Sequence, residues 1–289
     1  MKITFSPRIA LVVAAAIFLH HNATAIPATV DLGTASSFAI LAYSEITDAG
    51  AASTIKGNVG LSPTTGASIG LTAGQVGGTI YAVDAFGPSG SVNNPGLLTT
   101  ATHDLGLAFT DASGRSATPL AGGDNQLGGK SLISGVYSFS AASTANLVGT
   151  LTLDAQGNPN AVWIFQAPST LVTASHSSVV FKGGVGSACN VFWVVDSSAT
   201  LGTYTTFVGN IMAYASVGLE TGATLDGSAL AETAAVTLDH NTITQEDCSA
   251  NGSPNGNGGG VPDTGSTLLL LGSGLAALLA FRQRFFSPA

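Results

Sequence analysis

The chain has 289 residues, of which only 8% are charged and 45% are hydrophobic. Globular domains carry roughly 25% charged residues and disordered chains are rich in charge, so this composition excludes disorder. It predicts a folded body covered mainly by hydroxyls, small methyl groups and backbone. The net charge is −8, and the basic residues between the two ends of the chain are Lys56, Arg115, Lys130 and Lys182. Such a body has no basic stripe for phosphates, which excludes nucleic acid as a partner.

Residues 1–25 have the features of a secretory signal peptide. Lys2 and Arg8 give a positive start, "IALVVAAAIFL" gives the apolar segment, and "ATA" gives small residues before a cleavage site after Ala25. The apolar run is too short to span a bilayer comfortably. The sequence therefore predicts a secreted protein whose mature chain begins at residue 26.

The body from residue 30 onward consists of short runs that favour β-strands, with one interruption. Runs such as "SFAILAY", "GTLTLDA", "AVWIFQA" and "NVFWVVD" are rich in β-branched and aromatic residues and are bounded by turn residues. Residues 95–113 instead have apolar side chains at helical spacing, with Asn94 as the N-cap, Pro95 at the first position and Gly114 at the end. We expect an all-β body with one long helix.

A repeat with an offset of 18 residues marks the C-terminal half. "SATLGTYTTFVGNIMA" (198–213) aligns with "SVGLETGATLDGSALA" (216–231), and a weaker copy, "AVTLDHNTIT", follows at 235–244. Repeats of this length cannot bury an apolar face alone, so they stack as rungs of a solenoid. The side chains predicted to point inward are those of Leu201, Phe207, Leu219, Leu225, Leu238 and Ile243.

Cys189 and Cys248 are the two cysteines of the chain. In an exported protein an even pair predicts a disulfide. Neither has a second Cys or His at the spacing of a metal site, so we expect no metal and no cofactor.

The end of the chain has three parts: a flexible linker at 249–260, the motif "VPDTG", and an apolar stretch followed by Arg282 and Arg284. A plain membrane anchor is one interpretation. The tripartite order of residues 261–289 also closely resembles the VPDSG-CTERM variant of the PEP-CTERM sorting signals, with Thr264 in place of Ser. That resemblance implies recognition by an exosortase, removal of the helix after a transient membrane stage, and delivery to the envelope or matrix. The motif residues are Val261, Pro262, Asp263, Thr264 and Gly265.

The stretches "SSFAILA", "GNVGLSP", "LTLDAQGNPNAVWIFQ", "ACNVFWVV" and "TGATLDGSALA" resemble the ice-binding protein family of bacteria, fungi and algae. The resemblance extends from about residue 30 to residue 244. It implies a discontinuous β-solenoid over 26–248, an irregular right-handed β-helix of triangular section with the helix packed alongside. It also implies ice as the partner, bound on one flat face.

A pattern of the type T-A/G-X-T/N marks that face in some family members. Residues 221–224, "TGAT", match it fully; "TYTT" at 203–206, "TASH" at 173–176 and "DHNT" at 239–242 match in part. Threonine suits such a face because it offers a hydroxyl and a methyl group on a side chain with few rotamers. The predicted ice-binding residues are Thr173, Ser175, Thr203, Thr205, Thr206, Thr221, Ala223, Thr224 and Thr242.

Three alternatives stay open from the residues alone. The threonines could simply satisfy β propensity on a solvated face, and the solenoid could serve as a structural spacer in the cell-surface matrix or in adhesion. A polysaccharide-active enzyme would need clustered carboxylates with basic residues, and no G-x-S-x-G elbow frames any serine. We therefore expect that the protein is not an enzyme. We also expect a monomer.

Overall fold

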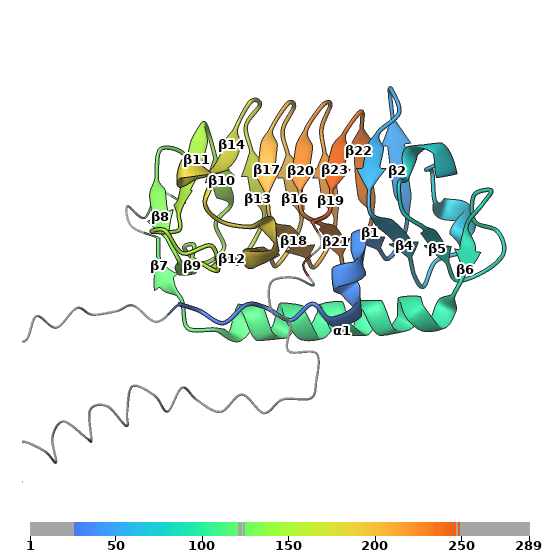
Figure 1. The fold of residues 1–289 in the computed structure, drawn as a ribbon, viewed down its shortest axis with the longest axis horizontal. Helices are drawn as coiled ribbons and strands as arrows, with labels where there is room; N and C mark the ends of the chain where they lie inside the picture. Colours follow the sequence, from blue (N-terminus) through green and yellow to red (C-terminus); the bar gives the residue numbers. More distant parts are fainter. Residues whose placement is uncertain (1–25, 121–122, 124, 247, 249–289) are drawn as a thin grey trace, which may run out of the picture. The chain divides into compact units, whose positions relative to one another are not determined.

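The computed structural model describes residues 26–120, 123, 125–246 and 248. Their strands form three parallel β-sheets, and from β8 to β23 successive strands of the chain lie in different sheets (Figure 1). The ten-stranded sheet contains, in spatial order, β6 (Val92–Asn93), β5 (Ile80–Ala82), β4 (Asn58–Leu61), β1 (Phe38–Ala42), β21 (Ala229–Ala231), β18 (Asn210–Ala213), β15 (Val191–Val195), β12 (Trp163–Ala167), β9 (Gly135–Ser138) and β7 (Thr118–Pro119).

The other two sheets are built in the same way. The six-stranded sheet contains β10 (Ala145–Leu147), β13 (Leu171–Thr173), β16 (Ala199–Leu201), β19 (Val217–Leu219), β22 (Val236–Asp239) and β2 (Ile46–Ala49). The seven-stranded sheet contains β3 (Thr54–Lys56), β23 (Thr242–Thr244), β20 (Thr224–Asp226), β17 (Thr206–Val208), β14 (Ser178–Phe181), β11 (Thr150–Asp154) and β8 (Ser131–Ile133). Short 3-10 helices are η1 (Gly33–Ser37), η2 (Gly66–Ser68), η3 (Ala73–Gln75), η4 (Lys182–Gly184) and η5 (Ala188–Asn190).

The 18-residue repeat sets the register of neighbouring rungs, as predicted. Leu201 pairs with Leu219, Thr206 with Thr224, and Ala213 with Ala231. The six side chains that were predicted to point inward are all at most 3% exposed. The core of the solenoid therefore follows directly from the alternation of apolar residues along each strand.

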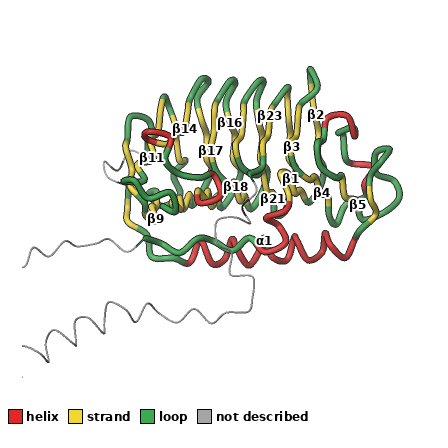
Figure 2. Tube along the Cα trace, viewed as in Figure 1, coloured by secondary structure: helices red, strands yellow, loops and turns green. Residues whose placement is uncertain are grey.

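The rungs do not stack in the order of the sequence. β1 pairs on one side with β4 and on the other with β21, so the N-terminal strands join the solenoid beside its last C-terminal rung. The chain then runs to one end of the solenoid, and the helix leads to β7 at the other end (Figures 1 and 2). Parallel pairing between segments that are far apart in the sequence keeps each sheet continuous across this break in chain order.

The helix α1 spans Pro95–Gly114, which confirms the predicted helix. The side chain of Asn94 accepts a hydrogen bond from the backbone N–H of Leu97 at 3.1 Å and caps the first turn. One face of α1 is buried and packs against the outer side of the ten-stranded sheet. Its buried residues are Leu98, Ala101, Leu105, Ala108 and Ala112. Each buried leucine contributes about 1.5–3 kcal/mol to this packing.

The tryptophans belong to the solenoid core, as predicted. Trp193 is 1% exposed, and its ring stacks on Phe165 with a centroid distance of 4.1 Å. Its indole N–H donates to the carbonyl of Val208 at 2.9 Å, so the polar edge of the ring is satisfied inside the core. These side chains are therefore not platforms for stacking sugars.

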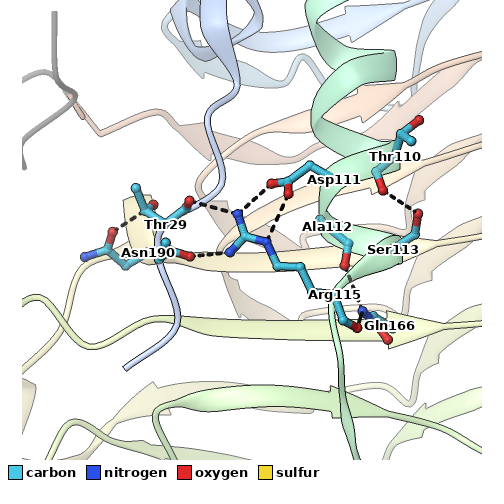
Figure 3. A network of polar contacts seen from close by, with 9 residues as sticks. Thr29, Thr110, Asp111, Ala112, Ser113, Arg115, Gln166 and Asn190 are labelled. Atoms are coloured by element: carbon cyan, nitrogen blue, oxygen red, sulfur yellow. Dashed lines mark hydrogen bonds and ion pairs between the residues drawn. The ribbon is translucent and has the colours of Figure 1, made fainter. Parts of the chain in front are cut away.

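Residues 26–32, here called the N-terminal strap, run along α1 (Figure 1). Val30 and Leu32 are buried in the same apolar layer as the helix. Arg115, directly after α1, donates to the carbonyls of Ala28 and Thr29 and pairs with Asp111 (Figure 3). The strap is thus held both by apolar burial and by one guanidinium group.

Both cysteines are disulfide-bonded, as predicted. The proposed signal peptide, linker and sorting segment lie outside the described residues. Among the residues that the structure describes, no helix is long and apolar enough to span a bilayer. That same part of the chain contains no group of three or more His, Cys, Asp or Glu side chains suited to a metal ion.

Candidate functional site

Helix α1 decides which sheets can present a binding face. In the centre of the ten-stranded sheet, the outward side chains of Phe192, Val194, Met212 and Leu230 are at most 1% exposed and lie in the apolar layer that they share with α1. Within the described residues, the outer faces of the six-stranded and seven-stranded sheets are left open to solvent. A ligand that presents a flat surface must therefore bind one of these two faces.

The seven-stranded sheet carries an uninterrupted row of hydroxyl side chains, here called the hydroxyl file. Each member pairs in register with the next, and none of them is buried. Neighbouring strands lie about 4.8 Å apart, so the file repeats its hydroxyl groups, and in every threonine a methyl group, at a fixed interval. In spatial order it consists of Thr150, Ser178, Thr206, Thr224, Thr242 and Thr54.

The equivalent row on the six-stranded sheet is chemically mixed. Successive outward positions hold Asn146, Val172, Thr200, Gly218 and Thr237, followed by Thr47. An amide, an aliphatic group and a glycine interrupt the hydroxyls there. The seven-stranded face is therefore the more regular of the two.

The structure brings three of the predicted residues together in the hydroxyl file: Thr206, Thr224 and Thr242. Ser175, Thr203 and Thr221 lie instead in the turns between the six-stranded and seven-stranded sheets. The hydroxyl of Thr221 donates to the carboxylate of Asp239. That hydroxyl is consequently engaged within the protein.

The prediction was wrong for Thr173, Thr205 and Ala223, which point into the solenoid and are 3%, 0% and 0% exposed. The hydroxyls of Thr173 and Thr205 bond to each other at 2.8 Å, and Thr205 also donates to the carbonyl of Ala174. These positions are two residues from the inward-pointing Leu171, Phe207 and Leu225. Alternation along the strand places them inside, and that signal was available in the sequence.

Three members of the hydroxyl file escaped the sequence prediction: Thr54, Thr150 and Ser178. Ser178 precedes its partner Thr206 by 28 residues, and Thr150 precedes Ser178 by the same interval. The 18-residue repeat does not reach them. Thr54 joins the file only because β3 pairs with β23 across the discontinuity.

The corner residue Tyr204, which departs from the expected Ala or Gly, does not disrupt the face. It has a positive φ of 57°, and its ring stacks on His176 with a centroid distance of 5.3 Å. The ring also lies against Gly222 of the next rung, where a Cβ atom would come within 2.4 Å of it. The glycine of the "TGAT" motif thus makes room for the tyrosine.

The hydroxyl file itself contains no charged side chain, whereas the row beside it contains Asp226 and Lys56. Asp226 lies there between Val208 and Thr244. Burial, followed by the negative charge of Glu246, raises the pKa of Asp226. Charged side chains hold hydration shells of their own, so their absence from the file keeps it suited to ordered water.

Comparisons with known proteins agree with this architecture. The family model described as ice-binding-like matches residues 40–244, and the VPDSG-CTERM motif matches residues 260–285. An ice-binding protein of Nostoc sp. (strain HG1) is 43% identical over 256 residues, 88% of this chain and 87% of that protein. One from Colwellia sp is 41% identical over 229 residues, 78% of this chain and 88% of its own.

Solved structures give the same result. The ice-binding protein from Antarctomyces psychrotrophicus is 38% identical with a TM-score of 0.65, covering 76% of this chain and 100% of its own. An antifreeze-active ice-binding protein from an Arctic yeast is 29% identical with a TM-score of 0.67, and the match covers 75% of this chain and 94% of that chain. Together with the sorting motif, these relatives indicate an extracellular or cell-surface protein. The chain belongs to the ice-binding-like family.

Proposed function

We propose that this protein adsorbs to ice through the hydroxyl file of the seven-stranded sheet and restrains ice growth or recrystallisation outside the cell. The role is one of binding, without catalysis. The solenoid would be right-handed and triangular in section, with α1 closing one side. The observation that carries the proposal is the in-register row of six hydroxyl residues on an open face.

Surface physics supports this role. A threonine hydroxyl can join ordered water, its methyl group favours an ice-like arrangement around it, and its χ1 angle is stiff. Little side-chain entropy is therefore lost on adsorption. Six rungs present a hydroxyl, and five of them also a methyl group, at a spacing of about 4.8 Å, so many weak contacts form together once the face is oriented. Thr203 and Ser175 would extend the contact at the corner, and Thr221, whose hydroxyl bonds to Asp239, would add its methyl group.

The two ends of the chain complete the proposal. A signal peptide cleaved after Ala25 would export the chain, and an exosortase-type enzyme would act at the "VPDTG" segment after a transient membrane stage. The mature protein would then work as a monomer at the cell surface or in the matrix. The VPDSG-CTERM match at residues 260–285 supports the sorting step.

Recrystallisation of ice in the presence of purified residues 26–248 tests the function. The solved Antarctomyces chain is covered in full by 76% of this chain, which supports using the body without its tail. We expect the body to hold ice grains small at micromolar concentration. If grains coarsen as fast as in buffer, the solenoid is not an ice binder, and the structural or adhesive role takes its place.

A matched pair of variants tests the face. Thr206→Tyr places a bulky ring on the hydroxyl file, whereas Thr237→Tyr places the same ring on an exposed outward position of the six-stranded sheet. We expect Thr206→Tyr to weaken inhibition strongly and Thr237→Tyr to leave it nearly unchanged, with both circular dichroism spectra unaltered. The reverse result would move the ice-contact surface to the six-stranded sheet.

A further inference from the structure

The corners between the six-stranded and seven-stranded sheets share one backbone feature. A residue in the left-handed region turns the chain at each of several rungs, and these turns form a row of loops along one edge of the solenoid (Figure 2). Glycine adopts it at Gly149, Gly50 and Gly222, and Gly222 lies two residues before the hydroxyl file, as Tyr204 and His176 do. At that same position three further rungs have a larger residue, Tyr204, His176 or His240, with φ of 57°, 59° and 54°.

A bulky residue is out of place in this conformation. Its Cβ atom clashes with the backbone when φ is positive, whereas glycine has no such clash. The glycine rungs show that the turn closes without a side chain. Strain of this kind, where a strain-free residue is available, points to a function for the side chain itself.

The geometry gives the stacked rings of Tyr204 and His176 a surface role. Tyr204 is 56% exposed, yet its ring is fixed between His176, at 5.3 Å and 22°, and the bare backbone of Gly222. Tyr204 is two residues from Thr206, a member of the hydroxyl file. A flat, rigid, largely apolar area thus adjoins the file at its corner, and it would lose little entropy on adsorption.

We propose that Tyr204 and His176 form an aromatic rim that contacts ice together with the hydroxyl file. The rim extends the contact surface from the seven-stranded sheet onto the corner of the solenoid. This inference rests on the proposed function, because it assigns further binding residues to the same surface. It also gives a positive role to the one bulky residue that the "TYTT" motif places where Ala or Gly is expected.

The variant Tyr204→Gly tests the rim, since glycine already occupies the same corner in the next rung. We expect it to raise the concentration needed to stop recrystallisation roughly tenfold, as for the loss of an aromatic anchor from a binding surface. Tyr204→Phe keeps the ring and should retain the activity. Thermal unfolding of each variant shows whether the fold is intact.

Tyr43→Ala is the matched control, because Tyr43 is a 41% exposed tyrosine that follows β1 of the ten-stranded sheet. It should leave inhibition unchanged. If the unmodified protein is active and Tyr204→Gly is equally active, the rim inference is wrong while the proposed function stands. If Tyr204→Gly loses activity only in proportion to a lowered Tm, the ring serves the fold and the inference is likewise overturned. If the unmodified protein is inactive, the proposed function fails first.

Discussion

Replacement of Arg115 by alanine is the sharpest test of how the N-terminal strap is held. The Arg115 side chain is 19% exposed, and its guanidinium donates to the carbonyl of Thr29 at 3.0 Å and to that of Ala28. It also pairs with Asp111 through two contacts, of which the shorter is 2.5 Å (Figure 3). In Arg115→Ala all of these contacts are lost together.

The expected cost follows from these contacts. Hydrogen bonds from a charged donor contribute about 1.5–3 kcal/mol each, and a partly exposed ion pair adds about 0–1 kcal/mol. Because the strap is near the surface, we take the lower part of these ranges and expect a loss of about 3–4 kcal/mol. For a domain of this size that lowers Tm by roughly 6–16 °C.

Differential scanning calorimetry measures this change, and amide hydrogen exchange locates it. Faster exchange should be concentrated at the strap, where Val30 and Leu32 lose their anchorage. Lys182→Ala is the matched control, because Lys182 is 63% exposed and makes one ion pair, with Asp154. If Arg115→Ala and Lys182→Ala have the same Tm, Arg115 does not hold the strap and the reasoning is refuted.

Three further predictions concern stability. Burial raises the pKa of Glu232, and one of its carboxylate oxygens has no hydrogen-bond partner. The folded state therefore binds a proton on Glu232 more tightly than the unfolded state does. For that reason the free energy of unfolding rises as the pH falls through the raised pKa. Glu232→Gln should therefore raise Tm at pH 7 by roughly 2–4 °C, for a gain of about 1 kcal/mol, and a gain that persists undiminished at pH 4 would contradict this cause. Cys189→Ser removes the bond that restrains the chain between Cys189 and Cys248, and should lower the free energy of unfolding by about 2–5 kcal/mol; urea titration measures it, and an unchanged midpoint would disprove it. Gly227 has a φ of 140°, and a Cβ there would lie 2.2 Å from the carbonyl oxygen of Gly209. Gly227→Ala should cost about 2–3 kcal/mol, and a thermal melt within error of the parent would show that the corner can relax.

Local patterns in the sequence determined several parts of this protein. The helix was predictable because its cap, first proline and apolar spacing are all short-range signals. The register between rungs was predictable because residues 18 apart carry matching side chains, as for Leu201 and Leu219. The alternation of side chains along each strand also predicts that Thr173 and Thr205 point inward, because an inward leucine or phenylalanine lies two residues away.

The tertiary structure decided what depends on pairing between distant segments. β1 lies beside β21, and β3 beside β23, through contacts that span most of the chain and leave no local trace in the sequence. For that reason Thr54 enters the hydroxyl file only in the folded protein. The packing of α1 on the ten-stranded sheet also removes one of the three faces from solvent, because an amphipathic helix must bury its apolar side somewhere. The sequence alone could predict the rungs, whereas only folding determines which of their faces remains open.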